Sequence, residues 1–299
     1  MESKYYMKKQ NHTQDSELDL RYERYKALLE ELTIMSDIFM RNVFKSRECT
    51  EYILQVIMEK SDLQVKDQTI QKDYKNLQGR SAVLDCVAKD LSGKQYNIEI
   101  QQDSEGASPK RARYHSGLLD MNTLNPGEDF DELPESVVIF ITQGDALGYG
   151  QPIYHITRKI EEVNETFQDE THIIYVNAKI QGDTELGRLM HDLNCKNAKD
   201  MYSEVLAKRV SELKETQEGV TVMCREMDKL YNEGIAIGEE RGVEIGEKRG
   251  VAIGEQRKAK EMAISLAKEG MSIEKIAEIA KVSVQLVQQW IGGSVGLVK

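Results

Sequence analysis

The stretch AVLDCVAKDLSGKQYNIEIQ, residues 82–101, decides the fold of this chain. Its first part, 82–88, is apolar except for Asp85, a pattern typical of a strand buried on both faces. In its last part, 97–101, polar residues alternate with isoleucines, as in a strand with one polar and one apolar face. Leu-Ser-Gly at 91–93 supplies turn residues between the two parts, so the stretch predicts an antiparallel hairpin.

The register of this hairpin follows from its turn. A three-residue loop that ends with Gly93 in the left-handed conformation pairs Asp90 with Lys94. Counting back along both strands places Asp85 opposite Glu99. The Cβ atoms of directly opposed residues lie about 4.5–5.5 Å apart, where two carboxylates repel each other unless a cation lies between them. The pair therefore predicts a site for Mg²⁺ or Mn²⁺, ions that prefer oxygen ligands.

An alternative interpretation is that Asp85 and Glu99 belong to the solvated face of a hairpin, where acidic residues are common. Two features of the sequence argue for a site instead. Asp85 interrupts an apolar run, where a solvated position is unexpected. The strand pair is also followed by a basic segment, 110–114 (Lys-Arg-Ala-Arg-Tyr), near the start of a predicted helix.

Around this hairpin the sequence predicts an α/β domain. Between 36 and 57 apolar residues recur at helical spacing, which indicates two amphipathic helices or one broken helix. Further strands are predicted at 65–74, 136–142 and 172–177, and further helices at about 109–124, 184–193 and 199–214. The segment before 172 is expected to be helical or irregular. The order helix, three strands, helix, strand indicates a mixed sheet covered by helices.

Composition places the chain among soluble globular proteins. It has 299 residues, of which 40% are hydrophobic and 30% charged, and its longest purely apolar run, 137–141, is far too short to span a bilayer. Residues 1–10 lack the apolar core of a secretory signal, so a cytoplasmic location is expected. The net charge of −11 argues against a general nucleic-acid coating protein but not against a nuclease, which needs only a local basic patch. The four scattered cysteines indicate neither a zinc site nor a disulfide framework.

The C-terminal part contains an internal repeat, GIAIGEER, GVEIGEKR, GVAIGEQR, with glycine at every fourth position from 234 to 254. Six glycines cost a helix roughly 5 kcal/mol relative to alanine, so a helix here is expected to need packing against another element. Close self-association is one interpretation, because a stripe of small residues lets backbones approach. A flexible linker is the alternative.

The last segment resembles a helix-turn-helix. Ser272 and Ser283 are good N-caps for two short helices joined by a tight turn. The alternative is a small helical hairpin that packs on the repeat or on a partner, because the second helix offers three glutamines but no Lys or Arg for reading DNA.

The segment 83–90, continued through Gly93 and 96–101 and followed by 111–114, resembles the PD-(D/E)xK nuclease family transposases, also described as the recombination-promoting nuclease or putative transposase group. The similarity runs from about 35 to 217 and includes the tail repeats. It implies a restriction-endonuclease-like core, α/β with a mixed sheet flanked by helices, and a helical C-terminal tail. It further implies a metal-dependent endonuclease that hydrolyses phosphodiester bonds of DNA in transposition or recombination.

The resemblance also implies roles for individual residues. Asp85 and Glu99 would be ligands of Mg²⁺ or Mn²⁺, with the Ile100 carbonyl as a third ligand. In the wider superfamily an acidic residue on the first helix often joins them, and Glu51 is the candidate in this chain. A solvated glutamate on a helix face is the alternative for Glu51.

Two positions depart from the superfamily signature. Leu84 replaces the proline before the first aspartate, and Gln101 stands where a lysine is usual. A glutamine has no charge to stabilise a transition state and cannot act as a base near neutral pH, so Gln101 could only orient the attacking water. The family that this chain resembles commonly carries this glutamine, so slow catalysis still fits.

The predicted DNA contacts are Lys110, Arg111, Arg113 and Tyr114. They lie near the N-terminus of a predicted helix, and helix N-termini favour anions such as phosphate. Solvated surface charge is the ordinary alternative for any one of the basic residues.

The predicted organisation is a charged N-terminal segment (1–30), a nuclease-like domain (31–217), a helical, glycine-repeat linker (218–257) and a helix-turn-helix-like hairpin (258–299). DNA is the expected partner, and a homo-oligomer through the repeat is a further possibility. A non-catalytic DNA-binding or assembly protein that keeps the nuclease fold is the alternative function. A serine or cysteine hydrolase lacks support because no GxSxG motif occurs, and without a Walker-type loop no nucleotide cofactor is expected.

Overall fold

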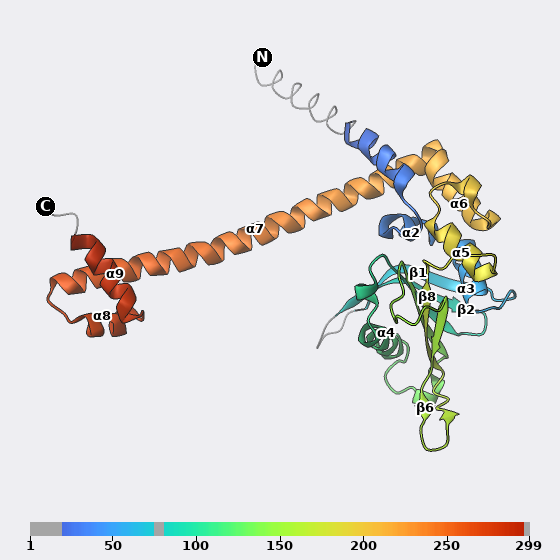
Figure 1. Cartoon of the computed structure of the whole chain (residues 1–299), viewed down its shortest axis with the longest axis horizontal. Coiled ribbons are helices and arrows are strands. Elements are labelled where there is room, and N and C mark those ends of the chain that lie inside the picture. Colours follow the sequence, from blue (N-terminus) through green and yellow to red (C-terminus); the bar gives the residue numbers. More distant parts are fainter. Residues whose placement is uncertain (1–19, 75–80, 296–299) are drawn as a thin grey trace, which may run out of the picture. The chain divides into compact units, whose positions relative to one another are not determined.

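The computed structural model describes residues 20–74 and 81–295 (Figure 1). The chain divides into two compact units, one that ends at Asp228 and one that begins at Lys229. Most of the predicted N-terminal segment, 1–19, lies outside the described residues, and 20–31 are helical. In the described part, no helix is both long and apolar enough to cross a membrane.

The first unit is built on a six-stranded mixed sheet in the order β1-β2-β3-β4-β8-β5. The first three strands pair antiparallel, β3, β4 and β8 pair parallel, and β5 pairs antiparallel with β8 at the edge. The bounds are β1 Val65–Tyr74, β2 Ala82–Asp90, β3 Gln95–Gln101, β4 Ser136–Thr142, β8 Thr171–Asn177 and β5 Ile153–Ile156. The predicted α/β class with a mixed sheet is therefore confirmed.

Burial follows the sequence pattern in the centre of this sheet. All seven residues of β4 are buried, as its nearly continuous apolar sequence predicts for a central strand. The edge strand β5 was not predicted, because four residues are too few to show a period. A separate two-stranded ribbon, β6 (Lys159–Ile160) and β7 (Glu165–Thr166), also lies in the stretch expected to be helical or irregular.

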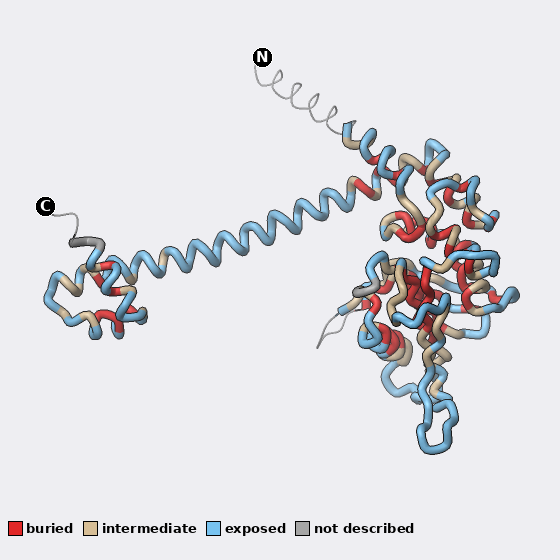
Figure 2. The backbone as a smooth tube through the Cα atoms, viewed as in Figure 1, coloured by how far each residue is buried: buried red, intermediate tan, exposed pale blue. Residues whose placement is uncertain are grey.

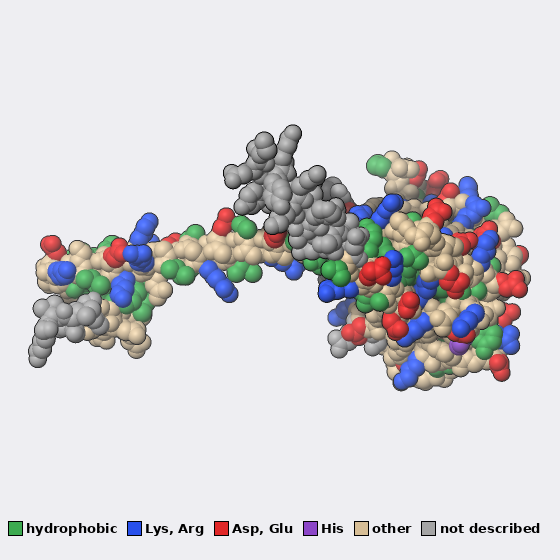
Figure 3. Space-filling view, turned by 90° about the horizontal axis from the view of Figure 1, so that it is seen from above, with side chains coloured by type: hydrophobic (Ala, Val, Ile, Leu, Met, Phe, Trp, Pro, Cys, Tyr) green, Lys and Arg blue, Asp and Glu red, His purple; other side chains and the backbone are tan. Residues whose placement is uncertain are grey.

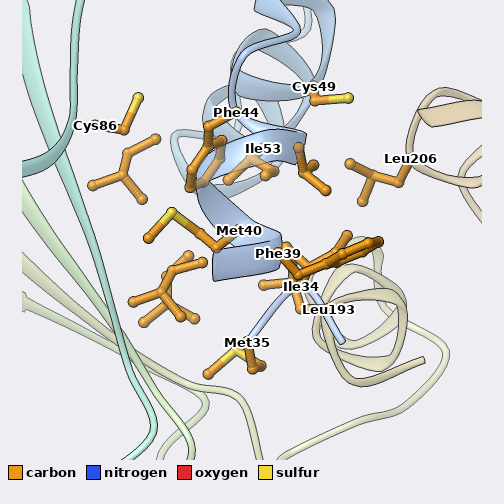
Figure 4. Close-up of a cluster of buried hydrophobic side chains, with 14 of the residues drawn as sticks. Ile34, Met35, Phe39, Met40, Phe44, Cys49, Ile53, Cys86, Leu193 and Leu206 are labelled. Atoms are coloured by element: carbon orange, nitrogen blue, oxygen red, sulfur yellow. The ribbon is translucent and has the colours of Figure 1, made fainter. Parts of the chain in front are cut away.

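Helices cover both faces of the sheet. One face packs against the helix 20–31, α2 (Asp37–Val43), α3 (Arg47–Ile57), α5 (Glu185–Asn194) and α6 (Glu204–Glu215) through the larger hydrophobic core. In Figure 4, Phe39 and Met40 of α2 lie between Cys86 of β2 and Leu193 of α5. The region 36–57 thus forms two helices, which was one of the two predicted alternatives.

The other face of the sheet packs against α4 (Pro109–Met121) and the short helical turn Ser104–Ala107 before it, which contributes Ala107. The start of α4 agrees with the prediction: the Ser108 side chain caps it by accepting a hydrogen bond from the Arg111 amide, and Pro109 occupies the first turn. The core on this side is smaller and includes Phe140 of β4 and Leu118 and Leu119 of α4. Polar residues of β3 lie within this layer, and they form the site described below.

The C-terminal part begins with one continuous helix, α7 (Gln217–Lys268), followed by α8 (Ile273–Ala280) and α9 (Val284–Val295). Both predicted serine caps are present: the Ser272 hydroxyl accepts from the Lys275 amide, and the Ser283 hydroxyl accepts from the Leu286 amide. A small core that includes Ala263, Ile276, Ala277, Val287 and Trp290 holds the end of α7 against α8 and α9.

The glycine repeat lies in an exposed part of α7. Residues 229–253 are all exposed (Figure 2), and a Cβ added at any of the six repeat glycines would meet no atom within 4 Å. Nothing in the described part of the chain therefore packs against the repeat. The expectation that the repeat is ordered by packing stays a prediction.

Candidate active site

The hairpin β2–β3 has the register that its turn predicts. Cys86 pairs with Ile98, so the next residues along the two strands are Asp85 and Glu99. At the turn, the Asp90 amide donates to the Lys94 carbonyl over 3.1 Å, and Gly93 has a φ of 92°. The left-handed glycine thus sets a pairing that brings two acidic residues face to face.

The two acidic side chains are linked through each other's backbones. The Asp85 amide donates to Glu99 Oε1 over 3.2 Å, and the Ile100 amide donates to Asp85 Oδ2 over 3.2 Å. Glu99 has no solvent exposure, and Asp85 is partly buried. The regular pairing of β2 and β3 ends at Cys86 and Ile98. Beyond that pair, the two carboxylates accept the backbone N–H groups of the facing strand.

Burial creates an electrostatic conflict at this pair. It raises the pKa of Asp85 to about 7, and the negative charge of Glu99 adds to the increase, while the hydrogen bond from the Ile100 amide opposes it. A divalent cation would remove the repulsion and would find oxygen ligands, which Mg²⁺ and Mn²⁺ prefer. The donor set therefore fits the metal that the sequence predicts.

Gln71 of β1 is a member of the site that sequence reasoning missed. Its Nε2 donates to Asp85 Oδ1 over 3.2 Å. Its φ is 54°, although it is not glycine, and it lies between the ladder pairs Ile70–Cys86 and Lys72–Leu84. A left-handed residue of this kind costs about 1–3 kcal/mol and is retained where the surroundings impose it, often at functional sites. No local sequence signal marks this conformation.

Arg111 of α4 lies against the acidic pair. Its Nη2 is 3.5 Å from Glu99 Oε2, and its Nη1 is 3.5 Å from Gln101 Oε1. Nη1 also donates to the Gly106 carbonyl over 2.8 Å, and Nε donates to His115 Nε2 over 3.3 Å. The sequence predicted a contact to DNA phosphates for Arg111. The structure places this guanidinium beside the predicted metal ligands.

His115 connects Arg111 to the other side of Glu99. Its ring is almost fully buried, and its Nδ1 is 3.5 Å from Glu99 Oε1 and 3.4 Å from Asn97 Nδ2. Its Nε2 accepts from Arg111 Nε, so the ring lies between this guanidinium and Glu99. Asn97 Oδ1 is buried without a hydrogen-bond partner.

Gln101 ends β3 in a close contact with the following turn. A Cβ at Gly106 would lie 2.5 Å from Gln101 Oε1, so a larger residue at 106 would shift the end of the Gln101 side chain. The side chain is partly exposed and meets Arg111, as described above. Gln101 thus lies at the partly exposed end of β3, next to the positive charge of Arg111.

Glu51 does not join the acidic pair. Its Oε2 accepts a hydrogen bond from the Val65 amide over 2.8 Å, which ties α3 to the start of β1. Among the described residues, Asp85 and Glu99 belong to no group of three His, Cys, Asp or Glu side chains whose ligand atoms all lie within 4.8 Å of one another. The helix acid whose charge acts on Asp85 is Asp37, at the start of α2.

The remaining predicted DNA contacts lie on the outer side of α4. Lys110, Arg113 and Tyr114 are exposed, unlike Ala112 and His115 on the buried side of the same helix. On the face of the first unit shown in Figure 3, basic and acidic side chains are interspersed and form no single basic patch.

A second group of metal-binding side chains, His191, Asp192 and Cys195, has its ligand atoms within 4.8 Å of one another. Both oxygens of the fully buried Asp192 already accept hydrogen bonds, from the Tyr202 and Ser203 amides, over 2.9 and 2.7 Å. This arrangement fastens the connection between α5 and α6, so its structural role accounts for the buried acid.

Comparison with known proteins gives one match. A family model described as PD-(D/E)XK nuclease family transposase matches residues 39–205, more than half of the chain. The matched region contains the whole six-stranded sheet and the residues Gln71, Asp85, Glu99, Gln101, Arg111 and His115. No curated protein and no solved structure matches the chain.

Proposed function

This chain belongs to the PD-(D/E)XK nuclease family transposases, and on that premise we propose that it is a metal-dependent DNA endonuclease that acts in transposition or recombination. The observation that carries the proposal is the buried pair Asp85 and Glu99, held face to face with a raised pKa on Asp85. Two carboxylates forced together in this way are costly unless they bind a cation, and perturbed acids of this kind concentrate at functional sites.

Asp85 and Glu99 would hold one Mg²⁺ or Mn²⁺ ion, and the Ile100 carbonyl is the proposed third ligand. The ion supplies Lewis acidity that polarises a phosphoryl oxygen and acidifies water. Gln71 and the Ile100 amide orient the Asp85 carboxylate through their hydrogen bonds. Hydrogen bonds around carboxylate ligands restrict their rotation and tune metal affinity.

The reaction is hydrolysis of a phosphodiester. The water oxygen forms a bond to phosphorus, the bond from phosphorus to the 3′ oxygen breaks, and one water proton ends on that 3′ oxygen. The other proton leaves with the new phosphate monoester or passes to solvent. Gln101 orients the attacking water by hydrogen bonds, since its amide can neither take up the proton nor supply charge.

DNA would approach the outer side of α4. Lys110 and Arg113 are exposed there and would contact backbone phosphates, with Tyr114 beside them. The N-terminus of α4 adds the favourable field of a helix end. Because these contacts involve the backbone, they give affinity and orientation and little sequence preference.

A non-catalytic DNA-binding or assembly protein remains the second candidate function. The observation that favours it is the exposed stretch of α7, where Ile237, Ile245 and Ile253 recur at every eighth position and are 50%, 50% and 65% exposed. Exposed apolar side chains on a helix with a small-residue stripe suit self-association of the tail.

Cleavage of supercoiled plasmid by the purified full-length protein tests the enzyme proposal. Nicking or linearisation is expected with Mg²⁺ or Mn²⁺ and none with EDTA, and Asp85→Asn and Glu99→Gln should each abolish it. Asp67→Asn, an exposed acid on β1, is the matched control and should cleave like wild type. Wild-type cleavage by Asp85→Asn would show that the pair is a structural feature and would end the nuclease proposal.

A further inference from the structure

Hydrolysis of a phosphodiester builds negative charge on the phosphoryl oxygens in the transition state, and preorganised positive groups lower the barrier. The strands of this site supply two carboxylates and the neutral Gln101. Apart from a bound ion, positive charge must therefore come from another element. The long helix that packs on this face of the sheet is α4.

Arg111 is the α4 cation that reaches the site. Its guanidinium touches both ends of the acidic motif, Glu99 and Gln101, at 3.5 Å each. Lys110 and Arg113, its neighbours in sequence, lie exposed on the outer side of the helix. A helix turns by about 100° per residue, so adjacent basic residues serve different surfaces.

Three contacts hold the Arg111 guanidinium in place. Nη1 donates to the Gly106 carbonyl, Nε donates to the buried His115 ring, and the guanidinium carbon lies 6.0 Å from the centre of the Phe140 ring. His115 is four residues further along the same helix, so the two side chains share one face. A guanidinium fixed in this way loses little freedom on binding phosphate.

The Arg111 side chain nevertheless remains open to a ligand. It is 39% exposed, whereas Glu99 beneath it is fully buried. A guanidinium has five N–H donors, and the hydrogen bonds to Gly106, His115, Gln101 and Glu99 occupy four of them. One N–H therefore remains for an oxygen that arrives from solvent.

We propose that Arg111 is a catalytic residue, whose guanidinium donates to a non-bridging oxygen of the scissile phosphate and supplies the charge that Gln101 lacks. This inference rests on the proposed nuclease function. Arg111 neither gives nor takes a proton, since a guanidinium stays charged at all accessible pH values. His115 is a positioning residue that acts through Arg111.

The test compares Arg111→Gln, Arg111→Lys and the double variant Gln101→Lys/Arg111→Gln in single-turnover cleavage at saturating DNA and metal. Arg111→Gln should slow cleavage by about 10²–10³-fold, as removal of one transition-state donor does. Arg111→Lys should recover part of the rate. The double variant should recover at least about tenfold, because its lysine restores a positive charge at the same place. Arg158→Gln, at an arginine that also pairs with an aspartate but lies outside the site, is the matched control.

Calorimetric titration with Mn²⁺ separates this role from a structural one. Removing a cation that is 3.5 Å from Glu99 should leave Mn²⁺ affinity unchanged or tighter, although cleavage falls. Cleavage by Arg111→Gln within threefold of wild type would overturn the proposal and leave the nuclease function standing. A loss of cleavage rate in Arg111→Gln that excess Mn²⁺ restores would also overturn the proposal. A wild-type protein that binds Mn²⁺ and cuts no DNA would overturn both.

Discussion

At the residue scale, the site depends on a few side chains whose neighbours set their charge and orientation. Asp85 is the clearest case, because a carboxyl that is ordinarily ionised at neutral pH is held here beside a second, fully buried carboxylate. Gln71 and Arg111 contact one acid each, so every carboxylate of the pair has a side-chain partner from another element.

The raised pKa of Asp85 predicts how stability depends on pH in the absence of metal. The folded-state pKa of about 7 lies above the ordinary value of 3.8, so the fold binds a proton more tightly than the unfolded chain does. The contribution of Asp85 to the free energy of unfolding should therefore be greatest below about pH 4. It should fall as pH rises towards 7. Melting temperatures in EDTA between pH 5 and 8 would measure this decrease.

Two comparisons check that Asp85 causes the decrease. Asp85→Asn should flatten the slope between pH 5 and 7, because its amide does not titrate. Mn²⁺ should restore stability above pH 7 in wild type and not in the variant, since a ligand that binds only the folded state stabilises it. An equal slope in both proteins would assign the pH dependence to other groups.

Substitution of Gln71 separates two effects. Its backbone carries the cost of a left-handed φ, and its side chain makes the hydrogen bond to Asp85. Gln71→Gly relieves the left-handed φ but removes the hydrogen bond to Asp85, and Gln71→Ala removes the bond and keeps the strain. The alanine variant should unfold more easily than the glycine variant by about 1–2 kcal/mol. Both should bind Mn²⁺ about 10–100-fold more weakly than wild type. Urea unfolding measures the difference in stability, and calorimetry measures the affinity for Mn²⁺. An alanine variant as stable as the glycine variant would show that the left-handed φ of Gln71 costs nothing measurable.

At the element scale, the hairpin β2–β3 and the helix α4 together form the site. The hairpin supplies the acids from adjacent strands, and α4 crosses the same face of the sheet with Arg111 and His115 turned inwards. The first turn of α4 positions Arg111, which is the third residue of the helix. The Ser108 side chain caps the helix by accepting a hydrogen bond from the Arg111 amide.

Capping of α4 can be changed without altering any residue that contacts the acids. Ser108→Ala should lower the free energy of unfolding by about 1 kcal/mol, and Ser108→Asp should retain the cap. If the cap also holds Arg111 in place, the alanine variant should cleave more slowly than the aspartate variant at saturating DNA. Chemical denaturation and cleavage rates give the two readouts. Equal stability of both variants would show that the cap contributes nothing measurable.

At the scale of the whole molecule, the chain combines a nuclease-like unit with a long helical tail. The first unit has its own cores on both faces of the sheet, and the second has a small core around Trp290. The tail exposes glycine, isoleucine and valine along α7 and carries both acidic and basic residues in every repeat. Such a helix suits association with a second copy.

Removal of the tail tests whether α7 associates with a second copy of the chain. Deletion of 234–299 should lower the number of protomers per particle, obtained by dividing the mass from light scattering by the mass of one chain, while the first unit keeps its fold. Replacing the six repeat glycines by alanine should strengthen the isolated helix by roughly 5 kcal/mol and yet weaken association, because the added methyl groups separate the backbones. An unchanged number of protomers per particle after the deletion would end the assembly role and leave the repeat as a linker.

The sequence by itself determined the parts of this protein that depend on short-range rules. A left-handed glycine and the alternation of side chains set the hairpin register, so Asp85 and Glu99 could be placed opposite each other. The apolar run of β4 predicted a central strand, and serines at fixed offsets predicted two helix starts in the tail. Each of these features is decided by residues within a few positions of one another.

Only the tertiary structure decided which distant side chains complete the site. Arg111 and Arg113 are equivalent as charges in the sequence, but the packing of α4 turns one to Glu99 and the other to solvent. The sequence offered Glu51 as a candidate ligand and missed Gln71. The hydrogen bond from Val65 to Glu51 and the left-handed backbone of Gln71 beside Asp85 depend on where β1 lies against its neighbours. Long-range packing fixes these directions, and the local periodicity of a single chain segment contains no information about its distant partner.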